Sequence, residues 1–216
     1  QELGDHLMNV LDRITQKSDD PDVRFAALLH DIGKPNSAWV DPETGGNHYY
    51  QKELDDGTIL GANHEEVGAD MVRELMNRLR YPNDRIDRVS ELVNHHMYGA
   101  FETPKGARKF LNRVGDHADD LLNLRWADQG GKTEYPASDV YNLDKEAELL
   151  AQVREQQAPT AVSQLAVNGN DLINELGMTP GPAIGQTLEE LVQRVIDDPS
   201  LNERETLLSI ANPMAL

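Results

Sequence analysis

The stretch Phe25-Ala26-Ala27-Leu28-Leu29-His30-Asp31-Ile32-Gly33-Lys34-Pro35 decides how this chain folds. Its apolar, helix-favouring first half predicts a buried helix, and the glycine, lysine and proline that follow predict the end of that helix. His30 and Asp31 therefore lie at the end of a buried helix, where ionisable side chains cost free energy unless a partner satisfies them. A bound divalent metal ion is one such partner. The alternative is an ordinary helix C-terminus, with His30 near the last carbonyl groups and Gly33 as the C-cap.

The composition limits the kinds of protein that this chain can be. Its 216 residues suffice for one sizeable core with a small appended subdomain, and they include no cysteine. Disulfides and thiolate metal sites are therefore excluded, so any metal site must use histidine and carboxylate ligands. No apolar run approaches the length of a membrane span, and the N-terminus lacks the basic and apolar regions of a signal peptide. We therefore expect a cytoplasmic protein without a membrane segment, and the start at Gln1 is expected of an excised or processed fragment.

The charge balance bears on the partners of the protein. The chain carries 38 acidic and 20 basic residues, a formal net charge of -18. Such an acidic chain repels the nucleic-acid backbone, so strong independent binding to nucleic acid is not expected. A small phosphorylated substrate fits better, as does a nucleic acid delivered by another, basic domain. With three Phe, two Trp and six Tyr, the chain also has little material for base-stacking platforms. The sequence leaves the oligomeric state open, a homo-oligomer included.

Several further helices are predicted to end, or to begin, at a histidine or an aspartate. The helical spacing of apolar residues places His6 on the apolar side of a helix over residues 3 to 17 and His64 at the start of a helix that runs to about residue 80. His95 and His96 end the next helix, and Asp128 ends a helix that begins at residue 117. Alone, each has an ordinary explanation, such as a satisfied core histidine or an exposed first-turn histidine. Asp128 is nevertheless unfavourable at the negative end of a helix dipole, by about 0.3 to 1 kcal/mol. Together, these coincidences predict a metal site.

Residues 36 to 63 interrupt the helical pattern. They contain Pro42 and four glycines around two short mixed stretches, residues 47 to 53 and 58 to 60. This composition predicts a long loop or a small hairpin between two helices. Because a loop of that length inside a compact domain is usually functional or mobile, the segment is a candidate lid or substrate-selecting insert. Its aromatic residues Trp39, Tyr49 and Tyr50 either contact a base or pack on one another.

The second half of the chain continues the helical pattern. A short helix over residues 104 to 113 holds the only positive cluster, which either binds an anion or compensates local acidity; it consists of Lys105, Arg108, Lys109 and Arg113. A polar helix over residues 139 to 157, a break at Pro159 and shorter helices as far as residue 210 follow. We therefore predict an all-α protein, with a helical bundle over residues 1 to 158 and a small helical C-terminal extension over residues 159 to 216 packed on or beside it.

Five segments carry a more specific pattern: His6-Leu-Met-Asn-Val-Leu-Asp12, residues 24 to 35, Gly61-Ala-Asn-His-Glu-Glu-Val-Gly-Ala69, Leu92-Val-Asn-His-His-Met97 and Arg125-Trp-Ala-Asp128. In this order they resemble the HD superfamily of metal-dependent phosphohydrolases, and in particular the HD domain of bacterial CCA-adding tRNA nucleotidyltransferases. Residues 166 to 185 and 202 to 205 resemble the C-terminal segment of the same enzymes. The chain departs from that family in two ways: the nucleotidyltransferase head is missing, and the insert over residues 36 to 63 is longer.

The resemblance implies a role for each of the candidate residues. His6, His30, Asp31 and Asp128 would ligate a divalent ion, whereas His64, His95 and His96 would ligate a second ion or contact the phosphate. Lys34 would contact the phosphate, with Arg125 and the basic-helix residues Lys105 and Arg108 as weaker candidates. Imidazole and carboxylate ligands without a thiolate suit Mn, Fe, Co, Ni, Zn or Mg. The residues leave open whether one ion or two are bound.

These roles describe a phosphohydrolase that acts on nucleotides or RNA ends, of the 2',3'-cyclic phosphodiesterase, phosphatase or nucleotidase type. The metal would activate water, Lys34 would offset charge on the phosphoryl oxygens, and a free imidazole, either His64 or His95, would protonate the leaving oxygen. Three alternatives stay open at this point: a deoxynucleoside triphosphate hydrolase, a non-catalytic RNA-binding body of a tRNA-processing enzyme, and a di-iron oxygenase.

Overall fold

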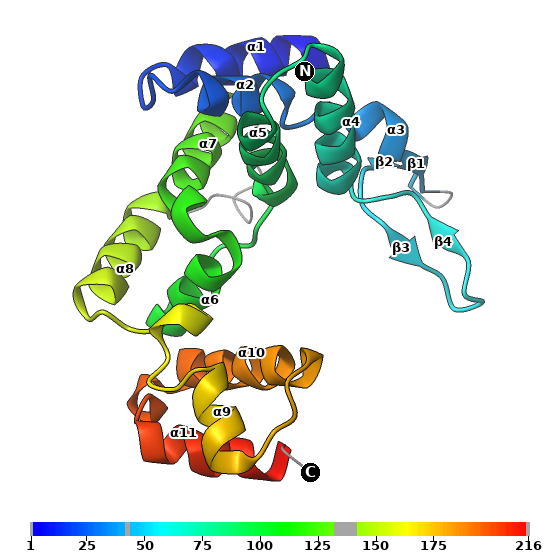
Figure 1. Ribbon diagram of the computed structural model, residues 1–216. Helices are drawn as coiled ribbons and strands as arrows, with labels where there is room; N and C mark the ends of the chain where they lie inside the picture. Colours follow the sequence, from blue (N-terminus) through cyan, green and yellow to red (C-terminus); the bar gives the residue numbers. More distant parts are fainter. Residues whose placement is uncertain (1, 42–43, 132–141, 215–216) are drawn as a thin grey trace. The chain divides into compact units, whose positions relative to one another are not determined.

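The computed structural model of the protein describes residues 2–41, 44–131 and 142–214 (Figure 1). Helices predominate in this part of the chain, and each of its strands is two residues long. The prediction of an all-α protein is therefore confirmed. The chain forms two compact units, one from residues 1–99 and 117–143 and the other from residues 100–116 and 144–216. Within the described residues, no helix combines the length and the apolar character that crossing a membrane requires.

The first unit is a helical bundle. Its helices are α1 (Leu3–Ile14), α2 (Pro21–Leu29), the short α3 (Lys34–Ser37), α4 (His64–Arg78), α5 (Asn83–His95) and α7 (Ala118–Gly131). Helix α2 contacts α1, α5 and α7, and α4 packs along α5. The apolar stripes predicted from sequence meet in this core, where Val10, Ala26, Leu92 and Leu121 are fully buried. The predicted helices of this half are confirmed, although α7 continues to Gly131 and Asp128 lies in its last turn.

Helix α2 begins and ends where its sequence predicts. The Asp20 carboxylate accepts a hydrogen bond from the Asp22 backbone N–H at 2.8 Å, and Pro21 occupies the first helical position. His30 follows the last helical residue, Leu29. Gly33 is not the C-cap of this helix, because it lies at the start of α3, against the first turn of α4. A Cβ atom at Gly33 would collide with the carbonyl oxygen of His64 and the backbone of Gly68, so glycine allows the two segments to approach.

We expect Gly33→Ala to lower the free energy of unfolding by about 1 to 3 kcal/mol, because the added methyl group meets backbone that cannot rotate away. Urea denaturation followed by circular dichroism measures the change. Gly4→Ala is the matched control, since Gly4 lies in α1 with nothing within 4 Å of the added atom. Alanine there should stabilise the protein slightly. Equal midpoints for the two variants would contradict this account of Gly33.

The segment between α3 and α4 consists of two small hairpins, which we call the insert (Figure 1). Strand β1 (Trp39–Val40) pairs antiparallel with β2 (Asn47–His48), and β3 (Lys52–Glu53) pairs antiparallel with β4 (Ile59–Leu60). The register places Trp39 opposite His48. Gly61, with φ +64°, lets the chain turn close to the Trp39 ring on its way into α4. The prediction of a hairpin insert is confirmed, with two hairpins in place of one.

The second unit has its own apolar core. Its helices are α6 (Pro104–Val114), α8 (Leu143–Glu155), α9 (Gly169–Leu176), α10 (Pro182–Asp197) and α11 (Arg204–Ala211), with short 3-10 helices at Val162–Gln164, Pro199–Leu201 and Asn212–Met214. Leu172, Leu191, Val195 and Leu207 are buried together. The compact unit groups α6 and α8 with the C-terminal helices, so the contacts do not divide the chain at residue 158. The domain boundary at that residue stays a prediction.

Candidate metal centre

Histidine and aspartate side chains from five parts of the first unit meet at one buried place. His6 comes from α1, His30 and Asp31 follow α2, His64 begins α4, His96 follows α5, and Asp128 lies in the last turn of α7. All six are buried, which excludes the alternative of an exposed first-turn histidine for His64. Six ionisable groups in a helical core are costly unless they satisfy one another or a bound cation.

His6, His30, Asp31 and Asp128 form the first half of this cluster. The Nε2 atoms of His6 and His30 are 3.2 Å apart, and Asp31 Oδ2 lies 3.4 Å from each of them. Asp128 Oδ1 lies 3.1 Å from His6 Nε2 and 3.5 Å from His30 Nε2. Ligands that bind an ion at about 2.1 Å are about 3.0 Å apart in an octahedron and about 3.4 Å apart in a tetrahedron. His6, His30 and Asp31 are therefore spaced like ligands of one metal ion, and Asp128 lies close to both imidazoles of this group.

Asp31, His64 and His96 form the second half. The Nε2 atoms of His64 and His96 are 3.2 Å apart, and Asp31 Oδ1 lies 3.2 Å from the first and 3.6 Å from the second. Asp31 thus directs Oδ2 toward His6 and His30 and Oδ1 toward His64 and His96. Asp31 would therefore offer one carboxylate oxygen to each half of the cluster.

Backbone carbonyl groups orient three of the imidazoles. The Nδ1–H of His30 donates to the Ala27 carbonyl at 2.8 Å, and that of His96 donates to the Val93 carbonyl at 2.7 Å. His64 Nδ1 is 3.0 Å from the carbonyl oxygen of Tyr49, in the insert. With the proton on Nδ1, each ring turns the lone pair of Nε2 into the cluster. This is the tautomer that metal-binding histidines adopt when their other nitrogen donates to a carbonyl.

The charges of the cluster call for a cation. Burial lowers the pKa of His30, but the Asp31 carboxylate and hydrogen bonds to Asp128 and Asp31 outweigh burial and raise that pKa to about 9. Burial raises the pKa of Asp31, but the His30 charge and the hydrogen bonds of the imidazoles hold that pKa well below its usual range. Burial also lowers the pKa of His96. In the metal-free protein the carboxylates therefore retain a proton on His30, and a divalent ion would displace that proton.

Lys34 lies at the edge of the cluster, in a cavity of about 380 Å³. Its Nζ is 2.5 Å from Asp31 Oδ2, and its side chain is only partly exposed. The cavity is lined by cluster and insert residues together, namely Asp31, Lys34, Asn47, His48, Tyr49, Tyr50, His64, Glu65, Met97 and Asp128. A cation beside candidate metal ligands, open to a cavity, suits an anionic group such as a phosphate.

Two of the predicted site residues of this unit have other partners. His95 Nε2 is 3.2 Å from Glu91 Oε2, one helical turn earlier, and His95 belongs to neither half of the cluster. The buried Arg125 guanidinium donates to the carbonyl oxygens of Tyr98 and Gly99, the latter at 3.4 Å. Arg125 therefore holds the chain that follows α5. The catalytic role of His95 and the substrate-binding role of Arg125 stay predictions without a contact in the cavity.

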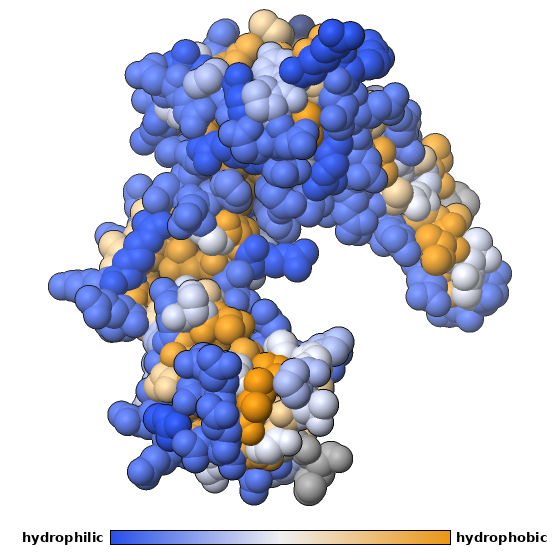
Figure 2. Space-filling view, in the orientation of Figure 1, coloured by the Kyte–Doolittle hydropathy of each residue, from blue (hydrophilic) through white to orange (hydrophobic). Residues whose placement is uncertain are grey.

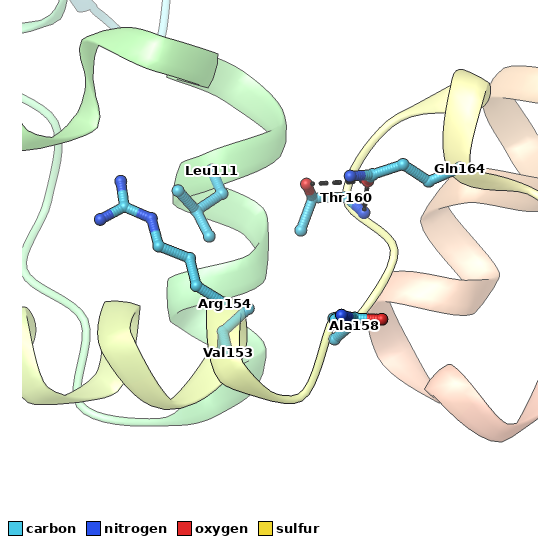
Figure 3. A pocket seen from close by; sticks show the side chains of 7 residues that line it. Leu111, Val153, Arg154, Ala158, Thr160 and Gln164 are labelled. Carbon is cyan, nitrogen blue, oxygen red and sulfur yellow. Dashed lines mark hydrogen bonds between the residues drawn. The ribbon is translucent and has the colours of Figure 1, made fainter.

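The predicted anion-binding residues of the basic helix lie in the second unit. Lys105 Nζ is 2.8 Å from Asp197 Oδ1, and the buried Arg108 donates from Nε to the Ile196 carbonyl at 2.7 Å. Both contacts fasten α6 to the end of α10, which accounts for these charges structurally. A separate cavity of about 450 Å³ in this unit is lined by Leu111, Val153, Arg154, Thr160 and Gln164 among others, and Gln164 turns toward Thr160 (Figure 3). Neither Lys105 nor Arg108 lines it, so their substrate role stays a prediction.

Sequence reasoning left out several residues of the cavity wall. The sequence assigned no role to Asn47, His48, Glu65 or Met97. All four line the cavity above Asp31. The signal that would have identified His48 is its pairing opposite Trp39, which depends on the register of β1 and β2. No periodicity reveals that register in two-residue strands.

Two protein families match the chain. Residues 3–128 match the HD domain, and residues 66–211 match the family described as tRNA nucleotidyltransferase domain 2, putative. The A-adding tRNA nucleotidyltransferase of Deinococcus radiodurans is 29% identical over 198 residues, which are 89% of this chain and 42% of the relative. The CC-adding tRNA nucleotidyltransferase of Thermus thermophilus is 31% identical over 173 residues, which are 80% of this chain and 35% of the relative.

These relatives extend well beyond the part that the chain matches, since the chain spans less than half of their length. A multifunctional CCA protein of Chromobacterium violaceum is 38% identical over 96 residues, 44% of this chain. The His and Asp residues that meet in the cluster all lie within the residues matched to the HD domain. The chain therefore belongs to the HD-domain family, and it is related to the CCA-adding tRNA nucleotidyltransferases over its HD and C-terminal regions.

Proposed function

We propose that this chain is a divalent-metal-dependent phosphohydrolase that acts on nucleotides or RNA ends, of the 2',3'-cyclic phosphodiesterase, phosphatase or nucleotidase type. The observation that carries the proposal is the position of Asp31, between two groups of imidazoles and at the base of a cavity that also holds Lys34. The names of the relatives, tRNA nucleotidyltransferases, support an RNA end or a nucleotide as substrate.

The donor set of the cluster fits a divalent ion. His6, His30, Asp31 and Asp128 would hold one ion, and Asp31, His64 and His96 would hold a second. Nitrogen and carboxylate donors suit Mn, Fe, Co, Ni, Zn or Mg. An ion bound there supplies a water of lowered pKa and polarises a phosphoryl oxygen.

The protein's own residues perform the remaining work. Lys34, which contacts Asp31 and lines the cavity, would bind a non-bridging phosphoryl oxygen and offset the charge that grows during the reaction. The Tyr49 carbonyl holds His64 in one orientation. Of the two candidates to protonate the leaving oxygen, His64 lines the cavity, whereas His95 faces Glu91. We therefore assign this role to His64 if only one ion is bound, with Nε2 carrying a proton in addition to the one that Nδ1 donates to the Tyr49 carbonyl. Nε2 would give its proton to the leaving oxygen and return to the neutral ring, whereas a second ion would occupy this nitrogen.

Elemental analysis of the purified protein, paired with a substrate panel, tests the proposal. With Mn, Ni, Co or Mg, we expect hydrolysis of a nucleoside 2',3'-cyclic phosphate or a nucleoside monophosphate, and metal bound near whole-number stoichiometry. Release of inorganic triphosphate from a deoxynucleoside triphosphate would identify the triphosphohydrolase alternative. If no substrate is turned over faster than by His30→Ala protein with any metal, catalysis by this chain is refuted.

A second candidate is a non-catalytic RNA-binding body. The match of residues 66–211 to tRNA nucleotidyltransferase domain 2 favours it, whereas the net charge of -18 opposes it. Gel shifts with tRNA at physiological salt decide between the two candidates. Tight tRNA binding by protein that contains no metal would support the RNA-binding body.

A further inference from the structure

The insert forms one wall of the cavity above the candidate metal centre. Asn47, His48, Tyr49 and Tyr50 line the cavity together with Asp31 and Lys34. Of the three Phe, two Trp and six Tyr in the chain, Trp39, Tyr49 and Tyr50 lie within this one segment of the sequence. A chain that is poor in aromatic residues thus places three of them around one cavity or directly behind it.

The wall is joined to the metal centre through the backbone of Tyr49. The carbonyl oxygen of Tyr49 accepts from the His64 backbone N–H at 3.1 Å and lies 3.0 Å from His64 Nδ1. Lys34 Nζ lies 5.7 Å from the centre of the Tyr49 ring. A group bound against the insert is therefore held at a set position relative to His64 and Lys34.

Trp39 supports the rings of His48 and Tyr50 from behind. Its ring centre is 4.8 Å from that of His48 and 5.9 Å from that of Tyr50, and the rings of His48 and Tyr50 are 5.2 Å apart. Trp39 is buried, and its Nε1–H donates to the Tyr50 carbonyl at 2.8 Å. Tyr50, by contrast, is 48% exposed. A ring that is exposed yet braced by two others can bind a flat ligand with little loss of side-chain entropy.

The cavity lining offers partners for two different parts of one ligand. Lys34 and the candidate metal ligands suit a phosphate, whereas the exposed ring of Tyr50 suits a flat π-system. A nucleotide joins those two parts. We infer that Tyr50, supported by Trp39 and His48, stacks on the base of the nucleotide whose phosphate binds at Lys34. The inference rests on the proposed function and makes Tyr50 a specificity-determining residue of the same site.

The exposed apolar residues of the insert provide a matched control. Figure 2 shows hydrophobic surface over the two hairpins, where Val40 is 61% exposed and Ile59 is 58% exposed. Val40 lies beside Trp39 in β1 but does not line the cavity. Val40→Ala therefore changes the apolar surface of the insert without touching the wall.

Binding of 2-aminopurine riboside 5'-monophosphate tests the inference, because stacking quenches the fluorescence of this base. We expect saturable quenching with the wild-type protein and with Tyr50→Phe, which keeps the ring. Tyr50→Ala should raise the dissociation constant about ten-fold. Val40→Ala should leave it within about two-fold of the wild-type value. Val40→Ala should also leave hydrolysis of ribose 5-phosphate, which has no base, within the same range.

Either of two results would overturn the inference. One is an equal dissociation constant for Tyr50→Ala and Val40→Ala, and the other is an absence of quenching by the wild-type protein. Hydrolysis of ribose 5-phosphate, lost in His30→Ala, reports on the proposed function separately, so its failure is distinguishable from a failure to stack. A short oligoribonucleotide with 2-aminopurine at its 3' end distinguishes an RNA end from a free nucleotide as the ligand. The ligand with the lower dissociation constant is the preferred one, and quenching of the 2-aminopurine fluorescence in either ligand supports the inference.

Discussion

Asp31→Asn should remove bound metal and lower kcat/KM on the order of a thousand-fold, the largest effect that we expect from one substitution. Asp31 faces both halves of the cluster, with Oδ2 near His6 and His30 and Oδ1 near His64 and His96. Asparagine keeps the shape of the side chain but loses its charge and one of the two ligand oxygens. Elemental analysis of the dialysed protein, together with initial rates on the substrate found in the panel, measures both losses.

Asp22→Asn is the control for this substitution. Asp22 is also buried and accepts from Arg85 Nε at 2.8 Å, but it does not line the cavity. Its replacement should lower stability, because a buried charge-assisted hydrogen bond is lost, while metal content stays at the wild-type value. Wild-type metal content in Asp31→Asn would refute the assignment of Asp31 as the bridging ligand.

His96→Ala should reduce the bound metal from two ions to one and lower kcat on the order of a hundred-fold. The second half of the cluster offers Asp31 Oδ1 and the Nε2 atoms of His64 and His96, so removal of one imidazole leaves two of these three ligands. His6, His30 and Asp31 would still hold the first ion. Isothermal titration with Mn or Ni gives the stoichiometry directly.

Two neighbouring variants make this measurement decisive. His95→Ala tests the sequence-based role of His95, and its contact with Glu91 leads us to expect little change in stoichiometry. His117→Ala removes a histidine that lies outside the described metal groups and controls for the loss of an imidazole. If the wild-type protein binds a single ion and His96→Ala binds it equally well, the second site is refuted and His96 is a core histidine.

The helices were predictable because their signals are local. The cap at Asp20 and the left-handed Gly177, with φ +67°, depend on neighbours within a few residues. The apolar stripes of α1 and α5 repeat at the helical period, and α1 begins at Leu3 and α5 ends at His95, as predicted. The insert was predictable as a loop or a small hairpin but not in its strand pairing, because its strands are two residues long and carry no period.

The charge pattern of the basic helix did not reveal the partners of its residues. Lys105 and Arg108 were weaker candidates for binding an anion because they belong to the only positive cluster predicted in an acidic chain, with compensation of local acidity as the alternative. The structure gives them Asp197 and the Ile196 carbonyl as partners, and both lie far along the chain, at the end of α10. A contact over that separation depends on how α6 packs on α10, which the charge pattern does not encode.

The sequence by itself determined the helical fold, the family resemblance and the set of side chains able to hold a metal, because helix periodicity and ligand chemistry are properties of short segments. Only the tertiary structure decided which of those side chains enter the cluster and which lie outside it. His95 and His96 are about 100° apart around a helix axis, so packing of α5 on its neighbours turns His96 into the cluster and leaves His95 against Glu91. The pairing of β1 with β2 likewise brings His48 in front of Trp39. Such choices follow from contacts between segments far apart in the chain, whose geometry no local pattern contains.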